Sequence, residues 1–141
     1  MKELLIQLLL VVPITYGDFE YCKEIDGFNQ RGKHEIVIQD DVIIKNEIQV
    51  CKNATEKEWV ILHELGHQFW HTHLSITERK QYREMFSDKA EDFWRAYGMQ
   101  SLEEDFADNF ASIYLGKKYE RSEKYKQKID FIKKIIKRYE R

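Results

Sequence analysis

The chain has 141 residues, and 23 Lys and Arg against 25 Asp and Glu give it a formal net charge of -2. This length suits one domain over residues 1–141 and leaves little room for a second core. Hydrophobic residues make up 43% of the chain and aromatic residues 13%, which excludes an intrinsically disordered protein. Two cysteines, Cys22 and Cys51, are too few for a disulfide scaffold or an all-cysteine zinc site.

Residues 1–17 are open to two interpretations. A lysine, an apolar run over residues 4–12 and a glycine at the end are typical of a secretory signal peptide. Gln7 interrupts that run, and a small domain needs its apolar segments, so a buried helix or strand is the alternative. Export and a cytoplasmic location are therefore equally open. In an exported chain Cys22 and Cys51 could form one disulfide, whereas in a cytosol they would stay thiols.

The stretch 34–51 predicts short strands. Its isoleucines and valines alternate with other residues, and polar pairs interrupt them at 40–41 and 45–46. From residue 55 onward the apolar spacing changes to that of helices. The expected fold is α+β, with a small mixed sheet packed on a helix and further helices after it.

Four helices are expected, over residues 55–72, 75–97 and 102–115 and within 117–141. Capping-box patterns at Thr55 and Ser75 mark the start of the first two. Gly98 and Gly116 are placed to end the second and third.

The basic residues gather at the C-terminal end. Residues 117–141 hold 11 Lys and Arg against 4 Asp and Glu, whereas residues 1–116 hold 12 against 21. The tail has three interpretations: a helix that packs on the body, a latency segment over an acidic cleft, or a contact for an acidic partner. Its tyrosines fall partly on the apolar stripe, which argues against nucleic-acid binding, and nothing in the pattern supports membrane contact.

The pattern H-E-x-x-H occurs once, from His63 to His67, inside the first expected helix. Residues four apart share a helix face, so both imidazoles can bind one metal ion. Zinc bound in this way lowers the pKa of a coordinated water, and Glu64 is close enough to accept its proton. Gly66 has no side chain, which allows another element to pack close to the metal.

A third ligand is expected from the helix that begins near residue 102. Glu104 and Asp108 lie four apart on one face, so one can bind zinc while the other accepts the N–H of a ligating histidine. Glu103 and Asp105 fall off that face and are expected to be solvated. The alternative is that Glu104 completes a capping box with Ser101.

His73 is the competing third ligand. It lies six residues after His67, as in the H-E-x-x-H-x-x-G-x-x-H zinc proteases. Those proteases carry glycine three residues after the second histidine, where this chain has Trp70. His71 continues the ligand face but lies a turn too far along the helix. The missing glycine favours Glu104 over His73.

These residues, followed by Tyr97-Gly98 and the run Glu104–Ala111, resemble the gluzincin clan of zinc metallopeptidases. The chain is similar to the protease domain of anthrax lethal factor and to the archaeal minigluzincins, which are made as latent zymogens. The resemblance covers roughly residues 55–116. It implies a zincin-like fold, a zinc ion on His63, His67 and Glu104, and Glu64 as general base.

The same resemblance assigns two further roles. Asp108 corresponds to the acid that orients a ligating histidine, and Tyr97 to the residue that donates its hydroxyl to the oxyanion. The alternative for Tyr97 is the end of a core stripe.

The expected function is therefore a zinc-dependent endopeptidase. An extended peptide or protein substrate would pair with the edge of the small sheet. Two alternatives keep the zinc and lose the activity: a latent zymogen, or a catalytically silent interaction module that zinc stabilises. The intact Glu64 argues against the silent module, because a scaffold has no use for a base there.

Overall fold

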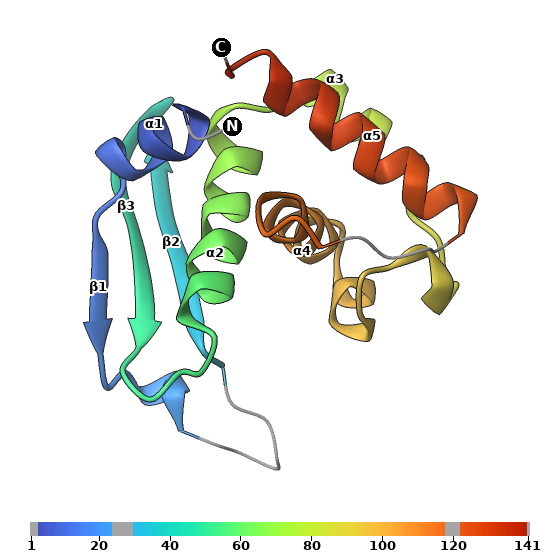
Figure 1. Cartoon of the computed structure of the whole chain (residues 1–141). Coiled ribbons are helices and arrows are strands. Elements are labelled where there is room, and N and C mark those ends of the chain that lie inside the picture. Colours follow the sequence, from blue (N-terminus) through green and yellow to red (C-terminus); the bar gives the residue numbers. More distant parts are fainter. Residues whose placement is uncertain (1–2, 24–29, 118–121, 141) are drawn as a thin grey trace.

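A small sheet and a set of helices make up the computed structural model, which describes residues 3–23, 30–117 and 122–140 (Figure 1). The helices and strands are α1 (Glu3–Val11), β1 (Ile14–Gly17), β2 (Gly32–Gln39), β3 (Val42–Cys51), α2 (Lys57–Thr72), α3 (Ile76–Arg83), α4 (Leu102–Tyr114) and α5 (Glu123–Lys137). Short 3-10 turns lie at Glu20–Cys22, Ala90–Asp92 and Ala96–Gln100. The expected α+β class with a small mixed sheet is confirmed.

The described sheet has three strands in the order β1-β3-β2. β1 runs parallel to β3, and β2 runs antiparallel to it. Asp40 and Asp41 connect β2 to β3 with φ angles of 51° and 62°, the left-handed geometry of a tight hairpin turn. β2 therefore lies at one edge of the sheet, beside α2.

Helix α2 is the centre of the fold, between the sheet and α4 (Figure 1). A Cβ atom on Gly66 would lie 2.9 Å from Cα of Ala107 on α4. The glycine thus lets the two helices pack closely, as expected from the sequence. α4 is itself buried from Asp105 to Ile113, because α2, α5 and the turn at Ala96–Gln100 surround it.

Two of the expected helix boundaries are wrong. The capping box at Thr55 does not form, because the chain enters α2 through Glu56 with a left-handed φ of 54° and no side-chain cap. The carboxylate of Glu56 lies 3.1 Å from Arg31 instead. The helix that begins at the Ser75 capping box ends at Arg83 and does not continue to residue 97.

The chain leaves the helical path after α3, because residues 84–100 make contacts that a continuous helix would not allow. Phe93 packs edge-on against Phe86 with ring centroids 5.2 Å apart. Asp92 accepts hydrogen bonds from Ser87 and Ser122. This segment places Arg95 next to Asp108 of α4 and leads into the turn at Ala96–Gln100.

The N-terminal segment is part of the packed body. Leu4 and Leu8 of α1 are fully buried, and Ile14 of β1 pairs with Ile48 of β3. Cys22 forms a disulfide with Cys51 at the end of β3. Among the described residues, no helix combines the length and the apolar character needed to cross a bilayer.

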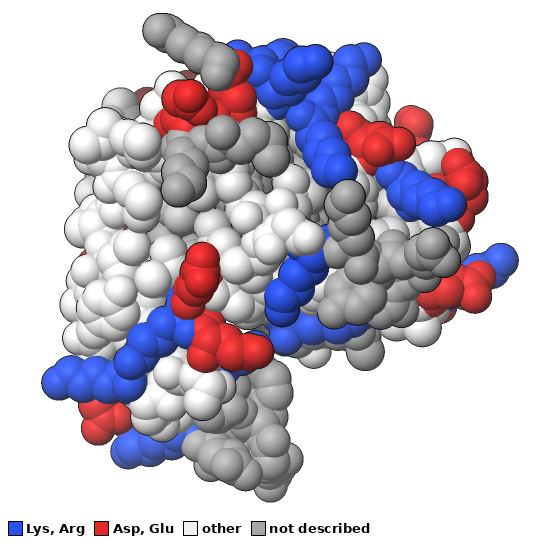
Figure 2. All heavy atoms as spheres, in the orientation of Figure 1, with Lys and Arg blue, Asp and Glu red and all other residues white. Residues whose placement is uncertain are grey.

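Helix α5 packs on the side of α4 that faces away from the sheet (Figure 1). Ile132, Ile135 and Ile136 are buried there. Figure 2 shows the basic side chains interspersed with acidic ones over α3 and α5, next to a broad surface without charges over α1 and α2. Residues 118–121 and 141 of the basic tail lie outside the described residues.

Candidate metal centre

The two histidines of the H-E-x-x-H pattern lie in the middle of α2, facing a cleft between the sheet edge and α4. His63, Glu64 and His67 are each more than nine-tenths buried. The cleft has a volume of about 190 Å³ and is lined by Gln30, Gly32, Lys33, His34, Ile36, Glu64, His67, His71, Glu103 and Glu104. Most of its lining groups are polar, and these groups come from β2 and the residue Gln30 shortly before it, from α2 and from α4.

His63, His67 and Glu104 form a cluster that can hold a metal ion, with one potential ligand atom from each within 4.8 Å of the others. Nε2 of His63 lies 3.2 Å from Nε2 of His67 and 3.0 Å from Oε2 of Glu104. The second carboxylate oxygen of Glu104 lies 3.2 Å from Nε2 of His67. Two imidazoles and one carboxylate are the ligand set of a catalytic zinc site that keeps a coordination position open.

Ser101 does not compete for the Glu104 side chain. The Ser101 hydroxyl accepts a hydrogen bond from the backbone N–H of Glu104 at 3.1 Å and so caps α4. The Glu104 carboxylate meanwhile faces the histidines. The cap and the ligand role therefore use different atoms of the same residue.

Asp108 lies behind His63, as the sequence indicates. Its Oδ1 is 2.9 Å from Nδ1 of His63, and the residue is fully buried. Arg95 approaches the same carboxylate with two N–H donors, each at 3.0 Å. The Arg95 guanidinium lies over Trp59, whose ring is stacked on Trp94. Arg95 is a residue that sequence reasoning missed, because its segment was expected to be helical.

Glu103 is partly buried and contacts two histidines, whereas the sequence predicted a solvated side chain. Its Oε1 lies 2.9 Å from Nδ1 of His67 and 2.6 Å from Nε2 of His71. The first turn of α4 crosses α2 at His67, so a residue off the Glu104 face still reaches the second histidine. Each histidine of the cluster therefore has its own carboxylate at Nδ1, the arrangement that orients metal-binding imidazoles.

Asp105 is also buried, contrary to expectation, and faces the opposite side of α4. It accepts hydrogen bonds from Lys128 of α5 at 3.0 Å and from Tyr82 at 2.9 Å. Burial raises the pKa of Asp105 to about 6, although Lys128 opposes this. The residue joins α3, α4 and α5 in the core.

The carboxylates of the cluster are kept ionised and the imidazoles protonated when no ion neutralises them. Burial would raise the pKa of Glu104, but hydrogen bonds with His63 and His67 outweigh it and lower the pKa to about 2. Burial would lower the pKa of His67, but Glu103 and Glu104 raise it to about 10. A cation bound here would displace those protons from the imidazoles.

Glu64 lies one residue round the helix from His63, beside β2. Burial raises its pKa, while the imidazoles and the backbone N–H of His34 act in the opposite direction. A Cβ atom on Gly32 would lie 2.5 Å from Cγ1 of Val60 and 3.7 Å from Cγ of Glu64. Glycine at this position lets the strand approach the base closely.

The remaining candidates lie elsewhere. His73 ends α2 next to Phe69 and Tyr139 and is not part of the cluster. The backbone of Tyr97 belongs to the turn at Ala96–Gln100, and its side chain lies outside the described part of the chain.

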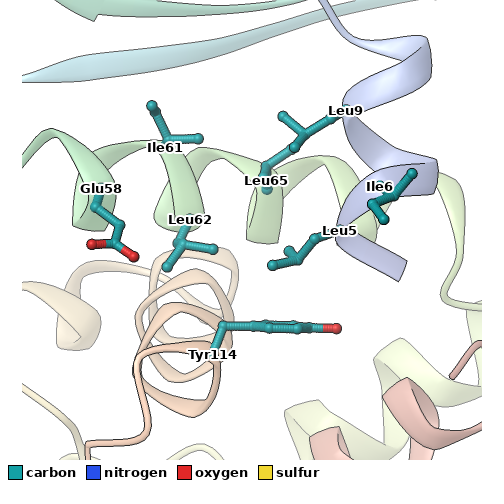
Figure 3. Close-up of a pocket in the computed structure, with 8 residues that line it drawn as sticks. All are labelled: Leu5, Ile6, Leu9, Glu58, Ile61, Leu62, Leu65 and Tyr114. Atoms are coloured by element: carbon teal, nitrogen blue, oxygen red, sulfur yellow. The ribbon is translucent and has the colours of Figure 1, made fainter. Parts of the chain in front are cut away.

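A second hollow lies on the opposite face of α2 and is apolar. Its volume is about 680 Å³, and it is lined by Leu5, Ile6, Leu9, Glu58, Ile61, Leu62, Leu65 and Tyr114 (Figure 3). Within the described residues this groove brings no histidine together with a carboxylate. The metal-binding chemistry is therefore on the cleft side of α2.

Comparisons with protein-family models, curated proteins and solved structures gave no match to this chain.

Proposed function

We propose that this chain is a zinc-dependent endopeptidase of the gluzincin type. The observation that carries the proposal is the convergence of His63, His67 and Glu104 within 4.8 Å, with Glu64 beside them in the same cleft. Two imidazoles and a carboxylate favour zinc over magnesium or calcium, which prefer oxygen ligands alone.

The chemistry divides between the ion and Glu64. His63, His67 and Glu104 would hold the zinc ion, which when bound would act as a Lewis acid that polarises the substrate carbonyl and lowers the pKa of water. Glu64 accepts the proton of the attacking water and later gives it to the amine of the cleaved bond, so the base is restored after each turnover. Burial raises the pKa of Glu64 above its ordinary value, which makes the carboxylate a stronger base.

The position of β2 supports a peptide as the substrate. An extended chain laid along a sheet edge is held by backbone hydrogen bonds, which do not depend on its sequence. β2 is an edge strand, and Gly32, His34 and Ile36 line the cleft that holds Glu64. A peptide bond of a chain added to this edge would lie next to the cluster.

The test is zinc content together with cleavage of a mixed peptide library, with Glu64→Gln as the variant. We expect about one zinc per chain in both proteins and a loss of cleavage in the variant of at least about 100-fold. Failure of the wild type to bind zinc would refute the assignment. Zinc binding without cleavage by the wild type would point to the silent module or the zymogen.

The location of α5 bears on the zymogen alternative. Its described residues pack on α4 and on the turn at Ala90–Asp92, and the residues that line the cleft belong to other elements. We therefore expect α5 to support α4 as a packing helix and not to cover the cleft.

A further inference from the structure

The outer edge of β2 offers backbone groups in a regular pattern. The backbone N–H of Cys51 donates to the carbonyl of Arg31 at 2.9 Å, which fixes Arg31 as a hydrogen-bonded partner of β3. In an antiparallel pair these partners alternate. The N–H and C=O groups of Gly32, His34 and Ile36 therefore point away from β3, toward the edge that no fourth strand of the described chain occupies. The Gly32 carbonyl accepts a hydrogen bond from Gln30 at 2.9 Å, and the backbone N–H of His34 faces Glu64. An added strand would therefore pair with the His34 carbonyl and with the N–H and C=O of Ile36.

The direction of β2 relative to α2 assigns the two ends of a bound peptide. Gly32 lies beside Val60 and Glu64, whereas the His34 ring lies 6.2 Å from His71, near the end of α2. Antiparallel addition is the more stable pairing. A peptide added in this way would place the residues that precede its cleaved bond along Ile36 and the strand beyond it.

The hairpin beyond Ile36 carries exposed apolar side chains on both of its strands, β2 and β3. The apolar residues at this end of the hairpin are Val37, Ile38, Val42, Ile43 and Ile44, with exposed fractions from 38% to 60%. An exposed apolar edge invites a further strand. The other end of the same edge, at Gln30 and Lys33, is polar.

We propose that the apolar end of the hairpin, residues 37–44, binds the N-terminal side of the peptide substrate. The chain then selects apolar residues about two to five positions before the cleaved bond. Continuity with the cleft identifies the occupant, because Val37 and Ile38 follow Ile36 on the same edge strand. Val42, Ile43 and Ile44 extend the apolar surface onto β3, where Ile43 pairs with Ile38. This inference rests on the proposed peptidase function for the cleavage position but not for the binding itself.

The first experiment compares the cleavage of three peptides of about ten residues. They differ only at three positions before the cleaved bond, which are all Val in the first peptide, all Ser in the second and all Glu in the third. The wild type should cleave the Val peptide about tenfold more efficiently than the Ser peptide. Ile38→Lys should remove this preference and favour the Glu peptide. Ile38 is 51% exposed, so the substitution leaves the core intact.

The matched control is Ile76→Lys on α3, where the isoleucine is 70% exposed and far from β2 in sequence. This variant should keep the preference of the wild type. An equal preference in wild type and Ile38→Lys, or an apolar preference confined to positions after the cleaved bond, would overturn the proposal.

The second experiment separates binding from cleavage. Hydrogen exchange is measured in the zinc-loaded Glu64→Gln chain with and without the Val peptide. The amide of Ile36, which faces the open edge, should exchange more slowly with the peptide, whereas that of Val37, which faces β3, should change little. Protection without cleavage by the wild type would refute the peptidase and keep the docking surface. Cleavage without protection or apolar preference would refute the docking surface alone.

Discussion

The Glu103 carboxylate lies 2.9 Å from Nδ1 of His67 and shares its oxygen with Nε2 of His71. It therefore does for His67 what Asp108 does for His63, at 2.9 Å from Nδ1. The two carboxylates differ in their other contact. Asp108 accepts two hydrogen bonds from Arg95, whereas Glu103 contacts His71. Both histidines are fixed from behind, which leaves their Nε2 atoms facing Glu104.

Removal of this support should weaken zinc binding. We expect Glu103→Ala to lower zinc affinity by about 10- to 100-fold, because His67 loses the acceptor that orients it. Glu103→Gln keeps an acceptor oxygen and should recover most of the affinity. Competition with a chelator measures both variants, with Glu91→Ala at an exposed site as the control. Equal affinities for Glu103→Ala and wild type would show that His67 needs no such partner.

The Gly66→Ala variant tests the close approach of α2 and α4. The added Cβ would lie 2.9 Å from Cα and 3.2 Å from O of Ala107, and both are backbone atoms that cannot rotate away. We expect a loss of about 1–3 kcal/mol in the free energy of unfolding and weaker zinc binding, because α4 carries Glu104. Urea unfolding and chelator competition measure the two effects.

A second substitution sharpens this test. Ala107→Gly in the Gly66→Ala chain removes a side chain but leaves the contacting backbone atoms in place, so stability should not recover. Recovery to the wild-type value would mean that the Ala107 methyl, and not the backbone, sets the distance between the helices.

The parts of the site that the sequence predicted are those that local spacing determines. Two histidines four apart share a helix face in any α-helix, and the Ser75 and Ser101 caps depend on neighbouring residues. The contacts of Glu103 and Asp105 could not be predicted from local spacing. The prediction gave this helix one functional face, whereas α4 is buried on several sides. The contacts of Glu103 and the burial of Asp105 depend on where α2 and α5 cross α4, which helical periodicity does not encode.

The helix predicted for the segment from residue 84 onward is absent for a related reason. Its aromatic residues recur at helical spacing, but Phe93 and Arg95 find partners on Phe86 and Asp108 that a continuous helix could not reach. Tertiary contacts therefore override the local preference.

Lys128 and Asp105 form a buried ion pair, 3.0 Å apart and each no more than 1% exposed. Lys128→Met should destabilise the chain by about 3 kcal/mol. Asp105 then loses the cation that offsets its burial, so it must either stay charged in the core or take up a proton, with hydrogen bonds from Tyr82 and Asn109 as its remaining contacts. Adding Asp105→Asn should restore part of that loss, since the remaining buried group is then neutral. Urea unfolding of the two single variants and the double variant measures the coupling. Additive effects would show that the two side chains do not depend on each other.

Asp92 should make the free energy of unfolding depend on pH in the acidic range. Hydrogen bonds from Ser122 and Ser87 lower its pKa below the ordinary value of 3.8. A lowered pKa means that the folded chain favours the charged form, so this stabilisation is present above about pH 4 and is lost as the pH falls through the folded pKa. We expect Asp92→Asn to lower the free energy of unfolding by about 1 kcal/mol near neutral pH. The difference from the wild type should shrink as the pH falls from about 4 through the folded pKa, because the carboxyl is protonated in both states only below the folded pKa. Urea unfolding between pH 3 and 7 measures it, and a difference that grows as the pH falls would contradict the assignment.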